Sequence, residues 1–256
     1  MKLKSKLLLA LLASTSATFV CAEEAADPLT FNVGVVSQYR YRGIAQTHGD
    51  PALQGGLDYA HSSGLYVGAW GSTIKWIKDN SQGANKVEGP VEIDLYGGYK
   101  FEAAGLAYDV GYLRYQYQGN SLEKTGGVAN GTYANANTDE VYAAVTAGVF
   151  TAKYSYSLGN LFGNLNSSGS QYIDLSATID MGNGYSLVPH VGRQSISNNT
   201  NGSYTDFALT LNKDFGKGLS GSLSAIGGPG EFYRSPYKGG YDMGKNALVA
   251  GVKYTF

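Results

Sequence analysis

Residues 246–256 read NALVAGVKYTF, and this stretch alternates in polarity up to its final position. Counted back from the end, the apolar or aromatic positions are Phe256, Tyr254, Val252, Ala250 and Leu248. A period of two residues indicates a β-strand with one apolar face. Chain ends are usually polar and frayed, so we expect this stretch to be a structural strand that ends on an aromatic residue.

The beginning of the chain has a different pattern. Three lysines within the first six residues precede an apolar run at 7–12, and the sequence Val20-Cys21-Ala22 has the small-residue character of a cleavage site. These features in this order predict a secretory signal peptide. We therefore assign residues 1–22 to a signal peptide and residues 23–256 to the mature domain.

The single cysteine of the chain, Cys21, falls within the predicted signal peptide. The mature domain would therefore be exported but would contain no disulfide. Acylation of Cys21, as in a lipoprotein, is a weaker alternative, because Val20 and Thr18 differ from the residues that usually precede a lipid-bearing cysteine.

Glycine and tyrosine are frequent, with 36 and 21 residues, whereas charged residues make up only 15% of the chain. This composition suits closely packed strands, and tyrosine suits a membrane interface because its ring is apolar and its hydroxyl is polar. Acidic residues outnumber basic ones once the signal peptide is removed. This balance, together with the lack of a basic patch, argues against a nucleic-acid partner.

The alternation of the C-terminal stretch recurs along the chain, and no segment shows a sustained helical period. Twelve stretches are predicted as strands, near 30–42, 51–60, 64–77, 90–101, 105–118, 138–149, 152–158, 170–181, 185–196, 203–215, 218–228 and 246–256. The third and fifth of these have irregular phases, so ten or fourteen strands are alternatives.

The connections between the predicted strands alternate between short and long. Those after even-numbered strands are short, such as HSSG, EAAG and GKG, and those after odd-numbered strands are longer and rich in Gly, Asn and Ser. Tight periplasmic turns and long outer loops are typical of outer-membrane barrels. We therefore predict an all-β fold, a transmembrane up-and-down antiparallel β-barrel of about 12 strands, in which the last strand pairs with the strand that starts near Thr30.

The faces of such a barrel follow from its surroundings. Its apolar face would meet lipid, and its polar face would line a water-filled lumen, because twelve strands enclose more space than side chains easily fill. A soluble periplasmic β-protein is a distant alternative. On this basis the predicted interface aromatics are Tyr39, Tyr41, Tyr59, Tyr99, Tyr154, Tyr254 and Phe256, and the tryptophans are expected at the same interface or the outer rim.

The sequence DMGNGYS at 180–186 allows one strand register to be predicted. A three-residue loop over 182–184 would place Met181 opposite Tyr185. The same register sets Ser176 opposite His190 and Asp180 opposite Ser186. Apolar residues then face apolar residues, as burial of one face requires.

The stretch 31–72 resembles the opening of the TorF-family porins of Gram-negative bacteria. The pattern that carries the resemblance is S-x-Y-R-Y-R-G at 37–43, followed by P-A-L-Q-G-G-L-D-Y at 51–59. Members of that family often have an acidic residue before the first tyrosine, where Gln38 stands here. The resemblance implies a barrel in the Gram-negative outer membrane more clearly than it implies a particular solute.

The C-terminal pattern also has a family counterpart. A final aromatic residue with apolar residues at alternating positions before it resembles the signal that the barrel-assembly machinery reads, and Phe256, Tyr254 and Val252 are the matching positions. The implied partners are this machinery, outer-membrane lipid and lipopolysaccharide.

Charged residues on the predicted polar face are candidates for setting solute selectivity. They are Arg40, Arg42, Glu92, Asp94, Lys100, Asp174, His190 and Lys253. Arg40 and Arg42 could form a basic ladder that attracts anionic solutes, or they could pair with lumenal acids such as Glu92 and Asp94. Glycines on the same face favour open space, although glycine also accommodates strand curvature.

Catalysis has little support in the sequence. Ser176, His190 and Asp174 form a nucleophile, base and orienting group in principle, but they face the predicted lumen rather than lipid. We expect no enzyme activity, no cofactor and no metal site. The predicted function is passive diffusion of small hydrophilic solutes, and the alternative is a closed outer-membrane barrel with a structural, adhesive or surface-recognition role.

Overall fold

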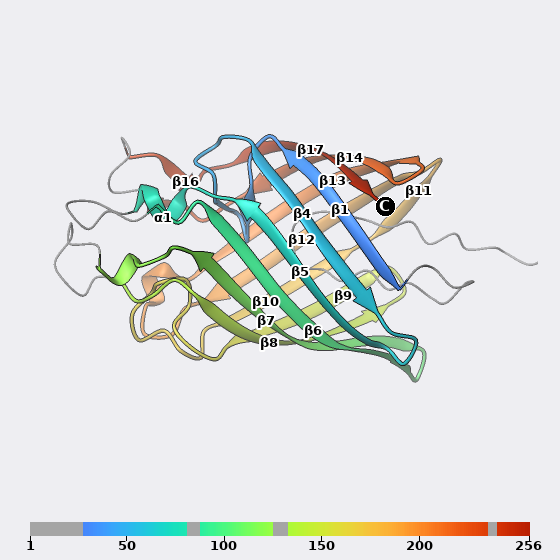
Figure 1. Ribbon diagram of the computed structural model, residues 1–256, viewed down its shortest axis with the longest axis horizontal. Coiled ribbons are helices and arrows are strands. Elements are labelled where there is room, and N and C mark those ends of the chain that lie inside the picture. The colour runs from blue at the N-terminus through green and yellow to red at the C-terminus, as the bar shows by residue number, and fades with distance from the viewer. Residues whose placement is uncertain (1–27, 81–87, 125–132, 235–239) are drawn as a thin grey trace, which may run out of the picture.

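The computed structural model describes residues 28–80, 88–124, 133–234 and 240–256 (Figure 1). The predicted signal peptide lies outside the described residues. Within them, the chain is almost entirely β-structure, arranged as tilted strands around a central lumen. None of the described helices has the length or apolar character needed to cross a membrane.

Twelve long strands form the barrel wall, with one of them divided in two. They are β1 (Leu29–Val36), β4 (Ala52–Ala60), β5 (Leu65–Thr73), β6 (Val91–Ala103), β7 (Leu106–Gln118), β8 (Thr138–Ala147), β9 (Phe150–Ser157), β10 (Gln171–Ala177) with β11 (Ile179–Gly182), β12 (Tyr185–Ser195), β13 (Tyr204–Gly216), β14 (Leu219–Gly227) and β17 (Ala247–Thr255). Each pairs antiparallel with its neighbours, and β10 also pairs with β12. The predicted fold class and strand number are confirmed.

The first and last strands close the barrel. Asn32 lies opposite Thr255, and the backbones of Phe31 and Phe256 exchange two N–H···O bonds of 2.9 Å. The rings of Phe31 and Phe256 stack with centroids 5.8 Å apart. The alternating C-terminal stretch is therefore a wall strand that ends in the closing seam, as predicted.

The five short turns lie at one end of the barrel and the long connections at the other (Figure 1). The long-connection end carries the remaining short elements: β2 (Arg40–Tyr41), β3 (Ile44–Ala45), α1 (Trp76–Asp79), η1 (Leu122–Lys124), η2 (Thr200–Gly202), β15 (Gly230–Arg234) and β16 (Asp242–Gly244). This arrangement confirms the alternation of connections that the sequence predicts.

Apolar side chains cover the outside of the wall. Leu53, Val67, Leu95, Phe207 and Leu248 are all more than two fifths exposed. Of the predicted interface aromatics, five point outward and are exposed: Tyr59, Tyr99, Tyr154, Tyr254 and Phe256. A contiguous exposed apolar surface of this kind is stable in lipid and not in water, so the barrel is suited to a membrane.

The predicted interface position is wrong for two of the aromatic residues. Tyr39 is only 2% exposed, and Tyr41 is part-buried against the lumenal ring of Tyr115. The reason is that the first wall strand ends at Val36 and not near residue 42. Beyond it the chain turns into the barrel, so these tyrosines face inward.

The predicted register around residues 180–186 is confirmed except at its turn. Ser176 pairs with His190, and Asp180 pairs with Ser186. Gly182, rather than Met181, lies opposite Tyr185, because the ladder shifts by one residue there. The three-residue loop is thus a two-residue turn preceded by a β-bulge.

A gap separates β10 from β11, and Pro189 on the facing strand β12 accounts for it. The N–H of Thr178 donates to the carbonyl of Val149, the residue before β9, so the backbone of Ala177 is directed to the opposite neighbour, β12. Its partner there is Pro189, which has no N–H to donate. The ladder resumes where Ile179 pairs with Leu187.

Replacing Pro189 by valine is expected to join β10 to β11 and to stabilise the barrel by about 1 kcal/mol, the net value of one hydrogen bond. Urea unfolding of the refolded protein would measure this gain. Leu209→Val, on the adjacent position of β13, supplies no new backbone donor and is the control. Equal effects of the two substitutions would show that the missing donor is not the cause of the gap.

Candidate functional site in the barrel lumen

Residues 37–51, here called the inserted segment, leave the wall after β1 and fold into the lumen. The segment forms the small β2–β3 hairpin, in which Arg40 pairs with Ala45 and Tyr41 pairs with Ile44. Its turn uses left-handed backbone at Arg42 (φ 46°) and Gly43 (φ 78°). Gly43 packs so closely on Asp206 that a Cβ there would lie 2.7 Å from the Asp206 Cβ.

Arg40 fixes one side of the inserted segment. Its guanidinium donates to the carbonyl oxygens of Gly43 at 2.9 Å, Met243 at 3.2 Å and Lys245 at 2.6 Å. It is 6% exposed, and its Nε donates to the Gln38 side chain at 3.0 Å. Among the described residues, no salt bridge joins Arg40 to a lumenal carboxylate. Arg40 therefore ties the inserted segment to the region of β16 and does not form part of a basic ladder along a wall strand.

Arg42 fixes the other side and lies deeper in the lumen. It makes a bidentate contact with Glu140 of β8, at 2.9 and 2.8 Å, and donates to Gln194 of β12 at 2.8 Å. Its guanidinium carbon also lies 4.1 Å from the centre of the Tyr172 ring. One side chain thus connects wall strands that are separated by β9 and β10.

The Arg42–Glu140 pair is desolvated, with side-chain exposures of 6% and 3%. Burial alone would lower the pKa of Arg42, but the adjacent Glu140 carboxylate raises this pKa well above its ordinary value. The guanidinium is therefore permanently charged. A buried, bidentate and fully charged pair of this kind defines one geometry for the inserted segment.

Tyrosines complete the contacts between the inserted segment and the wall. The Tyr39 hydroxyl donates to Glu92 of β6 at 3.0 Å, and the Tyr41 hydroxyl is hydrogen-bonded to that of Tyr115 on β7. Tyr115 donates in turn to Glu140 at 3.1 Å. The inserted segment therefore contacts β6, β7, β8 and β12 through polar groups.

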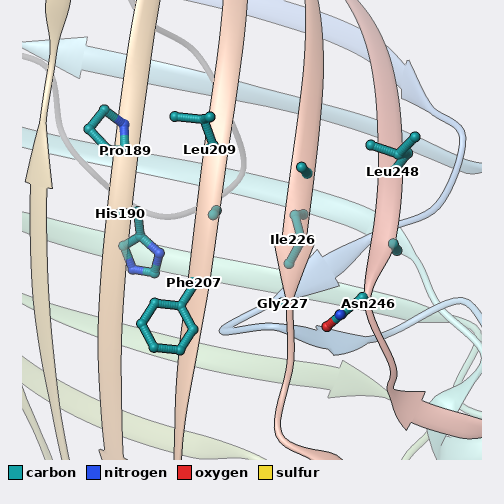
Figure 2. A pocket seen from close by; sticks show the side chains of 11 residues that line it. Pro189, His190, Phe207, Leu209, Ile226, Gly227, Asn246 and Leu248 are labelled. Atoms are coloured by element: carbon teal, nitrogen blue, oxygen red, sulfur yellow. The ribbon is translucent and has the colours of Figure 1, made fainter.

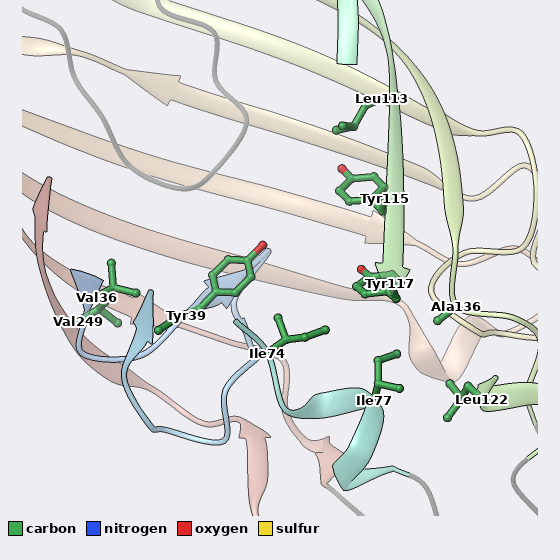
Figure 3. Packing of buried hydrophobic residues seen from close by; sticks show 11 residues of the cluster. Val36, Tyr39, Ile74, Ile77, Leu113, Tyr115, Tyr117, Leu122, Ala136 and Val249 are labelled. Carbon is green, nitrogen blue, oxygen red and sulfur yellow. The ribbon is translucent and has the colours of Figure 1, made fainter. Parts of the chain in front are cut away.

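Apolar packing fills the space around these polar contacts. Tyr39 lies in one buried cluster with Ile74, Ile77, Leu113 and Tyr117 (Figure 3). Leu113, Tyr115 and Tyr117 follow one another on the inner face of β7. Trp70, expected at the interface or rim, instead packs edge-on to Tyr39 with centroids 5.5 Å apart. The lumen near the long connections is consequently narrowed by packed side chains.

The remaining predicted lumenal residues lie on the inner face of wall strands. Glu92 and Asp94 of β6 are 1% and 2% exposed, and Lys100 lies 4.7 Å from the centre of the Tyr66 ring. Lys253 is on the inner face of β17, beside Gly34. The lumen therefore has a densely packed acidic and aromatic part and, toward the short turns, a part with lysines.

Asp174 and His190 lie together in a second polar cluster. His190 Nε2 is 2.9 Å from Asp174 and 3.2 Å from the Tyr172 hydroxyl, and its Nδ1 is 3.7 Å from Asp206. Among the described residues no hydrogen bond joins Ser176 to His190, although the two face each other. The imidazole is thus surrounded by two carboxylates and a phenol, and the arrangement is a lumenal polar network.

Tyrosine rings cover glycines on the inner wall. Tyr66 lies directly opposite Gly98, and Tyr96 directly opposite Gly68. The hydroxyl of Tyr66 donates to Asp109 at 2.6 Å. The expectation that lumenal glycines leave open space is wrong at these positions, because each glycine makes room for a neighbouring ring.

Gly98→Ala is expected to destabilise the barrel by about 1–3 kcal/mol, the usual range for overpacking. A Cβ at Gly98 would lie 2.4 Å from the Val110 carbonyl oxygen and 2.5 Å from the Tyr66 hydroxyl. Urea unfolding would measure the loss. In the control, Gly227→Ala, the nearest atom is 3.5 Å away, and a loss as large as that of Gly98→Ala would contradict the role of the covering ring.

Several residues of the site are missed by the sequence. Glu140, Gln194 and Asp206 stand on alternating polar faces like many other residues, and no local motif connects them with the inserted segment. The sequence feature that does point to this site is the pair Arg42-Gly43, because a glycine favours a turn with positive φ at that point. This turn directs Arg42 toward Glu140.

Outside the barrel, a shallow apolar groove runs over β12, β13, β14 and β17 (Figure 2). Its exposed side chains include Phe207, Leu209 and Leu248, and Pro189 lies at its edge. These residues belong to the lipid-facing surface and not to the lumen. His190, whose ring lies in the lumenal polar cluster, also contributes to the lining of this groove.

Residues 22–256 match the family model described as a bacterial protein of unknown function, Gcw_chp. The chain belongs to the Gcw_chp family. Among curated proteins, none matches the Gcw_chp chain in sequence.

Two solved structures with a similar architecture carry the names of porins. The Gcw_chp chain is similar to the KdgM porin, with a TM-score of 0.51, 6% identity and coverage of 89% of this chain and 99% of that one. It is also similar to the NanC porin, with a TM-score of 0.52, 11% identity and coverage of 89% and 98%. At such low identity the similarity concerns the fold, that of a closed membrane barrel.

Proposed function

We propose that this Gcw_chp protein is an outer-membrane channel for passive diffusion of small hydrophilic solutes, constricted near its outer end by the inserted segment. The observation that carries the proposal is a closed barrel with an apolar exterior and a lumen lined by charged and hydroxyl side chains. Water and polar solutes are the natural contents of such a lumen.

The orientation follows from the connections. Short turns face the periplasm and long loops face outward in outer-membrane barrels. The inserted segment then lies in the outer half of the lumen, and Lys100 and Lys253 lie nearer the periplasmic side. We propose that selectivity depends on these lysines together with the acids of the constriction.

Location and partners complete the proposal. The signal-like residues 1–22 would direct export, and Phe256, Tyr254 and Val252 would be read by the barrel-assembly machinery. Outer-membrane lipid and lipopolysaccharide would surround the barrel. The resemblance of residues 31–72 to TorF-family porins supports the same assignment, and transport rather than catalysis is the activity proposed.

A second candidate is a closed barrel with a structural, adhesive or surface-recognition role. It is favoured by the density of packing around the inserted segment, where Tyr115 and Ile77 have no exposed surface. In this case the long loops, and not the lumen, would carry the function.

Single-channel recording of the refolded protein in a planar bilayer separates the two candidates. Discrete current steps that scale with salt concentration are expected for the channel. The reversal potential under a salt gradient would then report whether lysines or acids dominate selectivity. A folded barrel that conducts neither as wild type nor after removal of the inserted segment would exclude the channel and leave the closed barrel.

A further inference from the structure

Two carboxylates in the constriction are buried, and among the described residues neither is paired with a cationic side chain. Glu92 and Asp94 occupy adjacent inward positions of β6 and are 1% and 2% exposed. The Glu92 Oε2 and Asp94 Oδ1 atoms are inaccessible and have no hydrogen-bond partner among the described residues. Neither residue takes part in a salt bridge there, since the nearby guanidinium of Arg42 is bound to Glu140.

The groups around these carboxylates make their ionised forms still less favourable. Among the described residues, the carboxylates of Glu92 and Glu140 act electrostatically on Asp94, and both are acidic. An ionised carboxylate that is buried without a partner costs several kcal/mol, so such groups are found paired or bound to metal ions. A positive charge beside Asp94 would stabilise the ionised form of its carboxyl group.

The neighbouring side chains form a wall suited to a cation. Asp94 lies between Trp70 on β5 and Tyr115 on β7, and Glu92 lies between Ser72 and Tyr117. Tyr39 covers them from the inserted segment, bonded to Glu92 and packed on Trp70. Hydroxyl oxygens and aromatic faces both interact favourably with cations.

We propose that the constriction holds a hard metal cation between Glu92 and Asp94, with Ca²⁺ as the ion that best matches two carboxylates and neutral oxygens. The described residues contain no group of three or more His, Cys, Asp or Glu arranged around one metal position. The remaining ligands are then hydroxyl groups or water, which Ca²⁺ accepts readily. The site requires only the folded barrel and goes beyond the proposed channel activity.

The cation would also act on the inserted segment. Tyr39 donates to Glu92, so an ion that holds Glu92 in place also holds the covering tyrosine. Binding to the folded state alone stabilises that state in proportion to the logarithm of the free ion concentration. Bound Ca²⁺ would thus add to the Arg42–Glu140 contact in keeping the inserted segment inside the lumen.

The test uses Tb³⁺ as a probe for Ca²⁺, because nearby tyrosine and tryptophan side chains transfer excitation energy to it. The whole mature protein is refolded in detergent and titrated with Tb³⁺, and Ca²⁺ is then added as competitor. We expect saturable sensitised emission that Ca²⁺ displaces. Asp94→Asn and Glu92→Gln should each weaken binding by about tenfold or more, because each removes one ligand charge.

The matched control is Asp180→Asn, which makes the same chemical change at an exposed acid beside a short turn. It should leave Tb³⁺ binding unchanged. Emission that persists equally in Asp94→Asn and Glu92→Gln would place the ion on surface acids and overturn the proposal. Absence of emission in the wild type would overturn it as well and would indicate a proton shared by the two carboxyl groups.

A second measurement covers the case in which a variant folds poorly. The midpoint temperature of thermal unfolding, followed by gel mobility, should be higher in Ca²⁺ than in a chelator for the wild type. For Asp94→Asn this temperature should be the same in both. Without cation, Asp94→Asn should be at least as stable as the wild type, since it removes an unpaired charge. Cation binding without conductance would refute the channel alone, and conductance without binding would refute this site alone.

Discussion

Replacement of residues 38–49 by a short glycine-serine turn is expected to raise the single-channel conductance several-fold. These residues include Arg40 and Arg42, whose contacts hold the inserted segment across the lumen. The wall strands β1 and β4 pair directly over eight positions, from Leu29–Tyr59 to Val36–Ala52, so a tight turn can join them. The wall would stay closed while the constriction is removed.

The matched control changes the opposite rim. Ser62→Gly combined with Ser63→Gly alters an exposed short turn and leaves the inserted segment intact. Its conductance should equal that of the wild type. An unchanged conductance in the 38–49 replacement, with a barrel that still resists unfolding, would show that another segment limits the current.

The sequence predicts the wall strands better than it predicts the inserted segment inside the lumen, because the two depend on different information. Wall strands repeat one physical rule, an apolar residue at every second position, and the turn at 183–184 carries the backbone preferences of Asn and Gly. This is why Ser176 and His190 could be paired from sequence. The bulge at Met181 shifts the register by one residue only at the turn, and no polarity pattern records it.

The alternation of apolar and polar residues no longer indicates a wall strand after the end of β1. Tyr39, Arg40, Tyr41 and Arg42 continue the alternation of the strand before them. Tyrosine and arginine each combine an apolar stem or ring with a polar tip, so both are compatible with a membrane interface and with a polar lumen. Only contacts far along the chain, such as Arg40 with Lys245 and Arg42 with Glu140, decide between the two. Periodicity therefore does not locate the constriction, although it does assign Arg40 and Arg42 to the polar face.

Arg42→Ala is expected to lower the free energy of unfolding by about 3–5 kcal/mol, the cost of leaving one member of a buried ion pair uncompensated. Glu140 would remain buried without its bidentate partner, and Gln194 would lose its donor. Arg42→Lys should fall between the wild type and the alanine variant, because an ammonium group keeps the charge and loses the fork geometry. Urea unfolding of the refolded protein measures each change.

The barrel supplies its own control for this prediction, since a second ion pair lies on the outward face. There Arg114 Nη1 donates to both carboxylate oxygens of Asp139 at 3.0 Å. The two side chains are 36% and 31% exposed, so Arg114→Ala should cost within about 1 kcal/mol. In Arg42→Met/Glu140→Gln, where both charges are gone, most of the lost stability should return, and the two single effects should not add. Equal losses of unfolding free energy for Arg42→Ala and Arg114→Ala would refute the view that Arg42 holds the inserted segment because its ion pair is desolvated.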